Sequence, residues 1–132
     1  MSVNSVSILA FLADINTQHS EMKRMLSNLS TLDASDNNSK RFLDSLNAMM
    51  DYVSLHFKTE EELMESLDYL HVARHKKEHT TFKNEIVRFC KEFVKDEFND
   101  FDKVVDFIEQ WLEEHDVAED IELVTFFTRA IR

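Results

Sequence analysis

Apolar side chains recur at intervals of three and four along most of this chain, and short polar runs separate the stretches that show the repeat. That spacing places the apolar positions on one face of an α-helix. It predicts four amphipathic helices: residues 6–29, residues 40–67, a third helix that includes residues 75–93, and a fourth that includes residues 101–115. A last apolar segment, residues 120–131, is expected either to extend the fourth helix or to fold back on the bundle.

The breaks between these helices are short and polar. A run of four polar residues, Asp36 to Ser39, follows the first helix, and residues 96–100 precede the fourth. Short connections make successive helices antiparallel neighbours. The sequence therefore predicts an all-α fold, an antiparallel up-down-up-down four-helix bundle, with residues 1–132 as a single domain.

The composition strengthens the helical prediction. The 132 residues include no glycine and no proline, whereas average usage gives about 9 and about 7 in a chain of this length. Hairpins and tight β-turns depend on these residues. Because 43% of the residues are apolar and 11 are phenylalanine, the chain has the material for one hydrophobic core.

The formal net charge of −11 makes partners with phosphate groups unfavourable. A surface of this sign repels a nucleic-acid backbone and anionic lipid headgroups, so we expect neither nucleic acid nor a membrane as a partner. The chain has one cysteine, Cys90, and no basic residue before Lys23. An intrachain disulfide is excluded and a signal peptide is poorly supported, and together these points predict a cytoplasmic protein.

Polar, metal-ligating side chains interrupt the apolar stripes of all four helices. They lie in register with the buried positions: His19, His56, Glu60, His75, His79 and His115. Within two of the helices a pair of them is four positions apart, so both side chains project from one helix face. Buried imidazole and carboxylate groups are costly unless a partner offsets their desolvation. Bundle cores that receive such side chains from facing helices are where metal sites are built.

The types and number of these side chains indicate which metal they suit. Imidazole and carboxylate ligands without thiolates suit iron better than a structural zinc site. The set also exceeds the four ligands of one tetrahedral zinc ion, whereas two carboxylate-bridged metal ions would use all of it.

Four short motifs, in this order along the chain, resemble those of the hemerythrin family in its single-domain bacterial form. Residues 17–19 (TQH) are similar to the end of DxQH, and residues 56–61 (HFKTEE) to HFxxEE. Residues 75–82 (HKKEHTTF) are similar to HxxxHxxF, and residues 111–115 (WLEEH) with Asp120 to WLxxH followed by an aspartate.

The resemblance implies a non-heme di-iron centre, with an oxo or hydroxo bridge, that binds O2 reversibly. One iron would be held by His75, His79 and His115, and the other by His19 and His56. Glu60 and Asp120 would bridge the two ions, which leaves an open position for O2 on the second. A dry wall around the site would come from residues near the ligands in sequence: Phe57, Met64 and Trp111.

Three places depart from the family's pattern. Asn16 stands where DxQH has aspartate, Tyr69-Leu70 where a tyrosine-proline pair is common, and Asp116 where an apolar residue usually follows the histidine. None of them is among the seven expected ligands. His115 and Asp120 are five positions apart, which is about 140° on a regular helix. The helix must therefore bulge or end between them if both are to face the metals.

Other polar residues near the motifs have simpler interpretations. Asp120 has the alternative of a solvated acid beside Glu119, and His71 is expected on the surface or in the loop before the third helix. Four glutamates are expected on solvated faces: Glu61, Glu62, Glu113 and Glu114. Cys90 is expected to be an inert packed thiol.

Three functions are compatible with such a centre. The first is a binding protein that carries, stores or delivers O2, which we prefer because the chain is expected to be a bare domain. The second is an enzyme, but no glutamate lies three positions before a histidine, as it does in ferritin-like oxidases; only peroxidase-type detoxification remains open. The third is a module that senses O2 or redox state. The sequence predicts neither a protein partner nor an oligomeric state.

Overall fold

The computed structural model describes residues 5–32, 38–94, 101–115 and 121–130. They form five α-helices and, within these ranges, no strand. The helices are α1 (Ser5–Ser30), α2 (Asn38–Ser66), α3 (Val72–Val94), α4 (Phe101–Glu114) and α5 (Ile121–Ala130). The predicted all-α class is confirmed, and the first two helices begin and end within two residues of their predicted limits.

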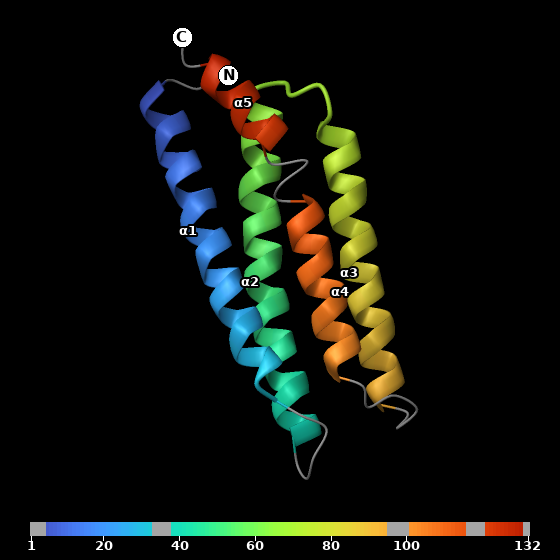
Figure 1. Cartoon of the computed structure of the whole chain (residues 1–132). Coiled ribbons are helices and arrows are strands. Elements are labelled where there is room, and N and C mark those ends of the chain that lie inside the picture. Colours follow the sequence, from blue (N-terminus) through green and yellow to red (C-terminus); the bar gives the residue numbers. More distant parts are fainter. Residues whose placement is uncertain (1–4, 33–37, 95–100, 116–120, 131–132) are drawn as a thin grey trace.

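The first four helices form an antiparallel bundle. Figure 1 shows α1 to α4 side by side, with successive helices running in opposite directions. Helix α2 contacts α1 and α3, while α4 contacts α3 and closes the ring on α1. This arrangement gives all four helices a face toward one shared interior.

The main core follows the apolar stripes that the sequence predicts. In α2, the apolar stripe includes Phe42, Leu46, Met49 and Val53, and each of these side chains is at most 1% exposed. Helix α4 buries two residues beyond its predicted stripe, Val105 and Leu112. Burial of large side chains at this level stabilises the fold by roughly 1.5–3 kcal/mol each.

Helix α5 folds back on the bundle and does not extend α4 (Figure 1). Leu123 is 1% exposed and belongs to a second apolar cluster with Ile15, Leu63, Met64 and Tyr69. Helix α5 also contacts α1. On the outside, Glu122 pairs with Arg74, their nearest atoms 3.2 Å apart. For the described part of this segment, residues 121–130, the second alternative is therefore correct.

The end of α2 has a Schellman motif without glycine. The backbone N–H of Tyr69 donates to the carbonyl of Met64 at 2.9 Å, and the N–H of Asp68 donates to the carbonyl of Glu65 at 3.3 Å. Asp68 has a φ of 52°, which is the left-handed conformation that this cap requires. The turn directs the chain into α3, which carries two of the expected ligands.

Among the described residues, no helix combines the length and the hydropathy that crossing a membrane would require.

Candidate metal centre

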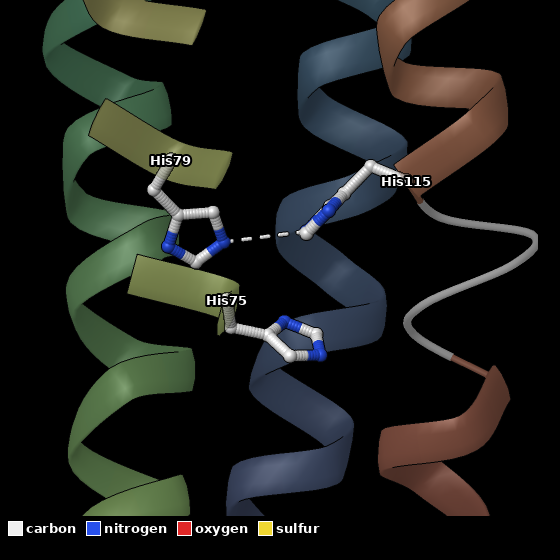
Figure 2. Close-up of side chains that lie close together, drawn as sticks. All are labelled: His75, His79 and His115. Atoms are coloured by element: carbon white, nitrogen blue, oxygen red, sulfur yellow. Dashed lines mark hydrogen bonds between the residues drawn. The ribbon is translucent and has the colours of Figure 1, made fainter. Parts of the chain in front are cut away.

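Three histidines from two helices meet in the interior. His75 and His79 come from α3, and His115 directly follows α4. Each is at most 3% exposed. One nitrogen from each lies within 4.8 Å of the others, and Nε2 of His79 is 3.3 Å from Nε2 of His115. Figure 2 shows these imidazole rings turned toward a common space.

A second group brings α1 and α2 together. It consists of His19, which is partly buried, with His56 and Glu60, which are fully buried. Nε2 of His19 is 3.1 Å from Nε2 of His56, and the latter is 3.0 Å from Oε1 of Glu60. One atom of each residue lies within 4.8 Å of the others. These six residues are the described part of the predicted ligand set.

Glu60 lies between the two groups. Its Oε1 atom, already 3.0 Å from His56, is 3.7 Å from Nε2 of His79 and 3.7 Å from Nε2 of His115. A single carboxylate thus faces histidines of both groups. If each group held a metal ion, Glu60 would be placed to contact both.

Helix geometry explains why these side chains converge. Residues four apart on a helix lie one above the other on the same face, which brings together His56 with Glu60 and His75 with His79. Helix α4 ends at Glu114, directly before His115. The predicted bulge or end of the helix between His115 and Asp120 falls on residues 116–120, which lie outside the described residues.

The outer nitrogen of His56 is held by a chain of hydrogen bonds. Nδ1 of His56 lies 3.0 Å from Oε1 of Gln18, and Nε2 of Gln18 donates to the hydroxyl of Thr59 at 3.2 Å. The Thr59 hydroxyl in turn donates to the carbonyl of Leu55 at 3.0 Å. These contacts orient the imidazole so that Nε2 faces the interior.

In the three-histidine group, the outer nitrogens of His79 and His115 face carboxylates instead. Nδ1 of His79 lies 2.9 Å from Oε2 of Glu61. Nδ1 of His115 lies 3.7 Å from Oε2 of Glu78, which is an electrostatic contact beyond hydrogen-bonding distance. Metal-binding histidines characteristically use their second nitrogen in this way, which fixes the ring and raises its basicity.

Burial and neighbouring groups set the protonation states in the interior. Burial lowers the pKa of His79 to about 3; of the nearby groups, Glu60 raises it and the other histidines lower it. Burial alone would raise the pKa of Glu60, but the side chains of His115 and His56 hold it well below its usual range. At neutral pH the site therefore offers a neutral imidazole at His79 and a charged carboxylate at Glu60.

The donor set fits a pair of metal ions. Neither carboxylate oxygen of Glu60 makes a hydrogen bond of good geometry with any described residue, although both are buried. A buried charge in this state is costly unless a cation compensates it. Neutral imidazole and carboxylate are also ligands that iron accepts. The residues present therefore match the iron that the motifs imply.

Comparison with known proteins identifies the family. Residues 10–127 match the family model described as the hemerythrin HHE cation binding domain. The chain belongs to the hemerythrin family. A bacteriohemerythrin of Clostridium acetobutylicum is 28% identical over 85 residues, which are 64% of this chain and 66% of that protein. The match thus spans slightly less than two thirds of the relative. No solved structure matches the chain at a significant level.

Members of the hemerythrin family bind non-heme iron, and this chain supplies two groups of side chains able to hold a metal ion. Aromatic rings pack directly on these groups. The ring of Phe57 stacks on His79, and the indole of Trp111 stacks on His115 with ring centroids 4.5 Å apart. Phe57 and Met64 are fully buried, whereas Trp111 is only partly buried. Two residues of the predicted apolar wall, Phe57 and Trp111, thus lie against ligands.

Two predicted positions of this hemerythrin chain, Asp116 and Asp120, lie outside the described residues. Asp120 remains a predicted ligand. His71 lies in the connection before α3, as predicted, and its Nε2 atom is 3.3 Å from Oε1 of Glu122. Cys90 is half-buried, and burial raises the pKa of its thiol, in keeping with the predicted inert thiol.

The prediction for one glutamate is wrong. Glu61 was expected on a solvated face with Glu62, Glu113 and Glu114, but it is partly buried and contacts His79. Burial raises the pKa of Glu61, while the ammonium groups of Lys76 and Lys83 lower it. The other three glutamates are exposed as predicted. The contact roles of Gln18 and Glu78 were also missed, although Gln18 stands next to a ligand within the TQH motif.

Proposed function

We propose that this chain binds O2 reversibly at a non-heme di-iron centre and serves to carry, store or deliver it. The observation that carries the proposal is the position of Glu60, whose Oε1 atom lies within 3.7 Å of histidines from both groups. One ion would be held by His75, His79 and His115, the other by His19 and His56. Glu60 and Asp120 would bridge them, with an oxo or hydroxo group as the third bridge.

The unequal number of histidines supports ligand binding over a purely structural role. Three imidazoles would hold one ion and two would hold the other, so the second ion would be one protein ligand short. A ferrous pair with an open position supplies the two electrons that reversible O2 binding needs. The protein's part is to keep that position accessible to a small diatomic molecule and closed to most others.

The interior residues favour reversibility. His79 offers a lone pair at neutral pH because burial keeps it uncharged, and Glu60 supplies negative charge between the ions. Phe57 and Met64 are fully buried, and the ring of Phe57 stacks on His79. Water and protons promote irreversible oxidation of a ferrous centre, so a dry wall extends the lifetime of the O2-bound protein.

The direct test is an anaerobic titration. Purified protein is loaded with iron, reduced with dithionite, desalted and titrated with O2 while its optical spectrum is recorded. We expect two irons per chain, a new charge-transfer band at one O2 per chain, and loss of that band under argon. His56→Gln should bind less iron and show no such band. His71→Gln removes a histidine outside the site and should behave like wild type.

Two outcomes would contradict the proposal. One is an iron content near or below one per chain in protein that is folded by circular dichroism. The other is steady consumption of peroxide with a reductant, in place of a stable O2-bound form, which would support the detoxifying enzyme.

A further inference from the structure

The two halves of the site present different acceptors to the outer histidine nitrogens. His79 contacts the carboxylate of Glu61 at 2.9 Å, whereas His56 contacts the neutral amide of Gln18 at 3.0 Å. The carboxylate of Glu78 adds a second negative charge beside the three-histidine group, 3.7 Å from His115. These contacts thus place carboxylates beside His79 and His115 and a neutral amide beside His56.

The direction of the bonds on the His56 side follows from their last acceptor. A main-chain carbonyl can only accept, so Thr59 donates its hydroxyl proton to Leu55. The hydroxyl oxygen then accepts from the amide nitrogen of Gln18. The amide oxygen of Gln18 is left facing Nδ1 of His56, which must be the donor. The partner of His56 is thus fixed as an uncharged acceptor.

On the other side, the direction follows from the carboxylate itself. An ionised Glu61 can only accept, so Nδ1 of His79 donates to it. Hydrogen bonds to a charged acceptor are roughly twice as strong as those between neutral groups. They transfer more electron density to the ring, which makes Nε2 of His79 the stronger donor toward a cation.

We propose that Glu61 and Gln18 are positioning residues that give the two halves of the metal centre different reduction potentials. The inference rests on the proposed di-iron function. Glu61 strengthens His79 and favours the ferric ion in the three-histidine half. Gln18 orients His56 without adding charge. The half that contains His56 should therefore have the higher reduction potential and be reduced first. Reduction would take two electrons, one for each ferric ion, from an external reductant such as dithionite, and neither residue forms or breaks a covalent bond.

A spectroscopic test uses zinc in place of iron, since zinc is diamagnetic and has no redox chemistry. In the zinc-loaded protein, the Nδ1 proton of His79 should resonate downfield of the Nδ1 proton of His56, because it is shared with a carboxylate. Glu61→Gln should move the His79 signal upfield, and Gln18→Glu should move the His56 signal downfield. Equal signals in the wild-type protein, or no movement in either variant, would overturn the inference.

An electrochemical test uses the iron-loaded protein. A potentiometric titration with dithionite should resolve two one-electron steps. Glu61→Gln should raise the potential of the second step, and Gln18→Glu should lower that of the first, so both variants bring the steps closer together. A tenfold change in the relative affinity for ferric and ferrous ion corresponds to about 59 mV for such a step. Glu62→Gln, an exposed change on the same helix, is the matched control.

Opposite shifts from the two substitutions separate positioning from simple damage. If both substitutions only loosened the fold, Glu61→Gln would not raise a reduction potential while Gln18→Glu lowers one. Shifts of the same sign, a wider gap between the steps, or an equal effect of Glu62→Gln would overturn the proposal. If the chain held no iron pair, the proposed function would fail, while the zinc spectra would still decide the contacts of Glu61 and Gln18.

Discussion

Phe57 lies flat on the imidazole of His79, with ring centroids 3.8 Å apart and an angle of 2° between the planes. Nδ1 of the same imidazole contacts Glu61, and its Nε2 faces His115. His79 is therefore restrained in its plane by polar contacts and perpendicular to its plane by an aromatic ring. Nζ of Lys83 lies 5.6 Å from the centroid of the same phenyl ring.

Replacing this ring should shorten the lifetime of the O2-bound protein. Phe57→Leu removes the flat cover over His79 and lets water approach, so we expect autoxidation several-fold faster, measured as the decay of the charge-transfer band in air. The substitution should also lower the free energy of unfolding by about 1–2 kcal/mol. Phe42→Leu is the matched control, because Phe42 is equally buried on the same helix but stacks on Phe101. It should lose similar stability with no change in autoxidation.

Glu60→Gln should separate metal binding from folding. The amide keeps the shape of the side chain but cannot bridge two cations as a carboxylate does, so iron content should fall well below that of the wild type. The metal-free variant should still fold but be somewhat less stable than the wild type, because His115 and His56 stabilise the charged carboxylate that the amide replaces. Metal analysis and urea unfolding measure the two effects. Glu62→Gln alters only an exposed residue. It should leave the iron content unchanged and shift the free energy of unfolding by no more than about 1 kcal/mol.

The stability of the metal-free protein should fall steadily with acidification. His79 has a pKa of about 3 in the native state, against 6.5 ordinarily. Between these values the unfolded chain binds a proton that the folded chain does not, so lower pH favours unfolding. The expected slope is about 1.4 kcal/mol per pH unit in the middle of this window. Urea unfolding from pH 7 to pH 4 measures it.

A histidine variant provides the comparison for this pH dependence. His79→Gln should have a shallower slope than the wild type. A wild-type stability that does not change between pH 6 and pH 4.5 would show that His79 can take up a proton without loss of the native interior.

Asp68→Gly should stabilise the fold without affecting the metal centre. The residue has a φ of 52°, and glycine adopts this conformation without the steric cost of a Cβ atom. We expect a gain of about 0.5 kcal/mol in the free energy of unfolding, after the entropy that glycine adds to the unfolded chain. Asp68→Val should instead lose about 1–2 kcal/mol. Equal stability of the two variants would contradict the assignment of the cap.

Most of the fold could be predicted because the helices of this chain are long and strongly periodic. The position of α5 could not be predicted, since its ten residues have an apolar face that suits either a continued α4 or a separate helix. Its placement depends on Leu123 entering the cluster around Tyr69. That contact joins segments distant in the sequence, and local periodicity carries no information about it.

The ligands were predictable, whereas the groups that orient them were not. Glu60 stands one turn after His56, so its inward direction follows from helix geometry alone. Glu61 is rotated by about 100° from Glu60 and reaches His79 only because α2 and α3 pack together with this rotation. Three consecutive glutamates give no local sign that the second contacts a histidine on another helix.

The hydrogen bonds that orient His56 end on the main-chain oxygen of Leu55, and a substitution cannot delete that oxygen. The side chain of Leu55 is 51% exposed, so other residues at this position would leave the carbonyl acceptor in place. The hydroxyl of Thr59 and the amide of Gln18 are side-chain groups, so a substitution can remove them. Homologues that keep this geometry should therefore vary at position 55 and retain a hydroxyl at position 59 together with an amide at position 18.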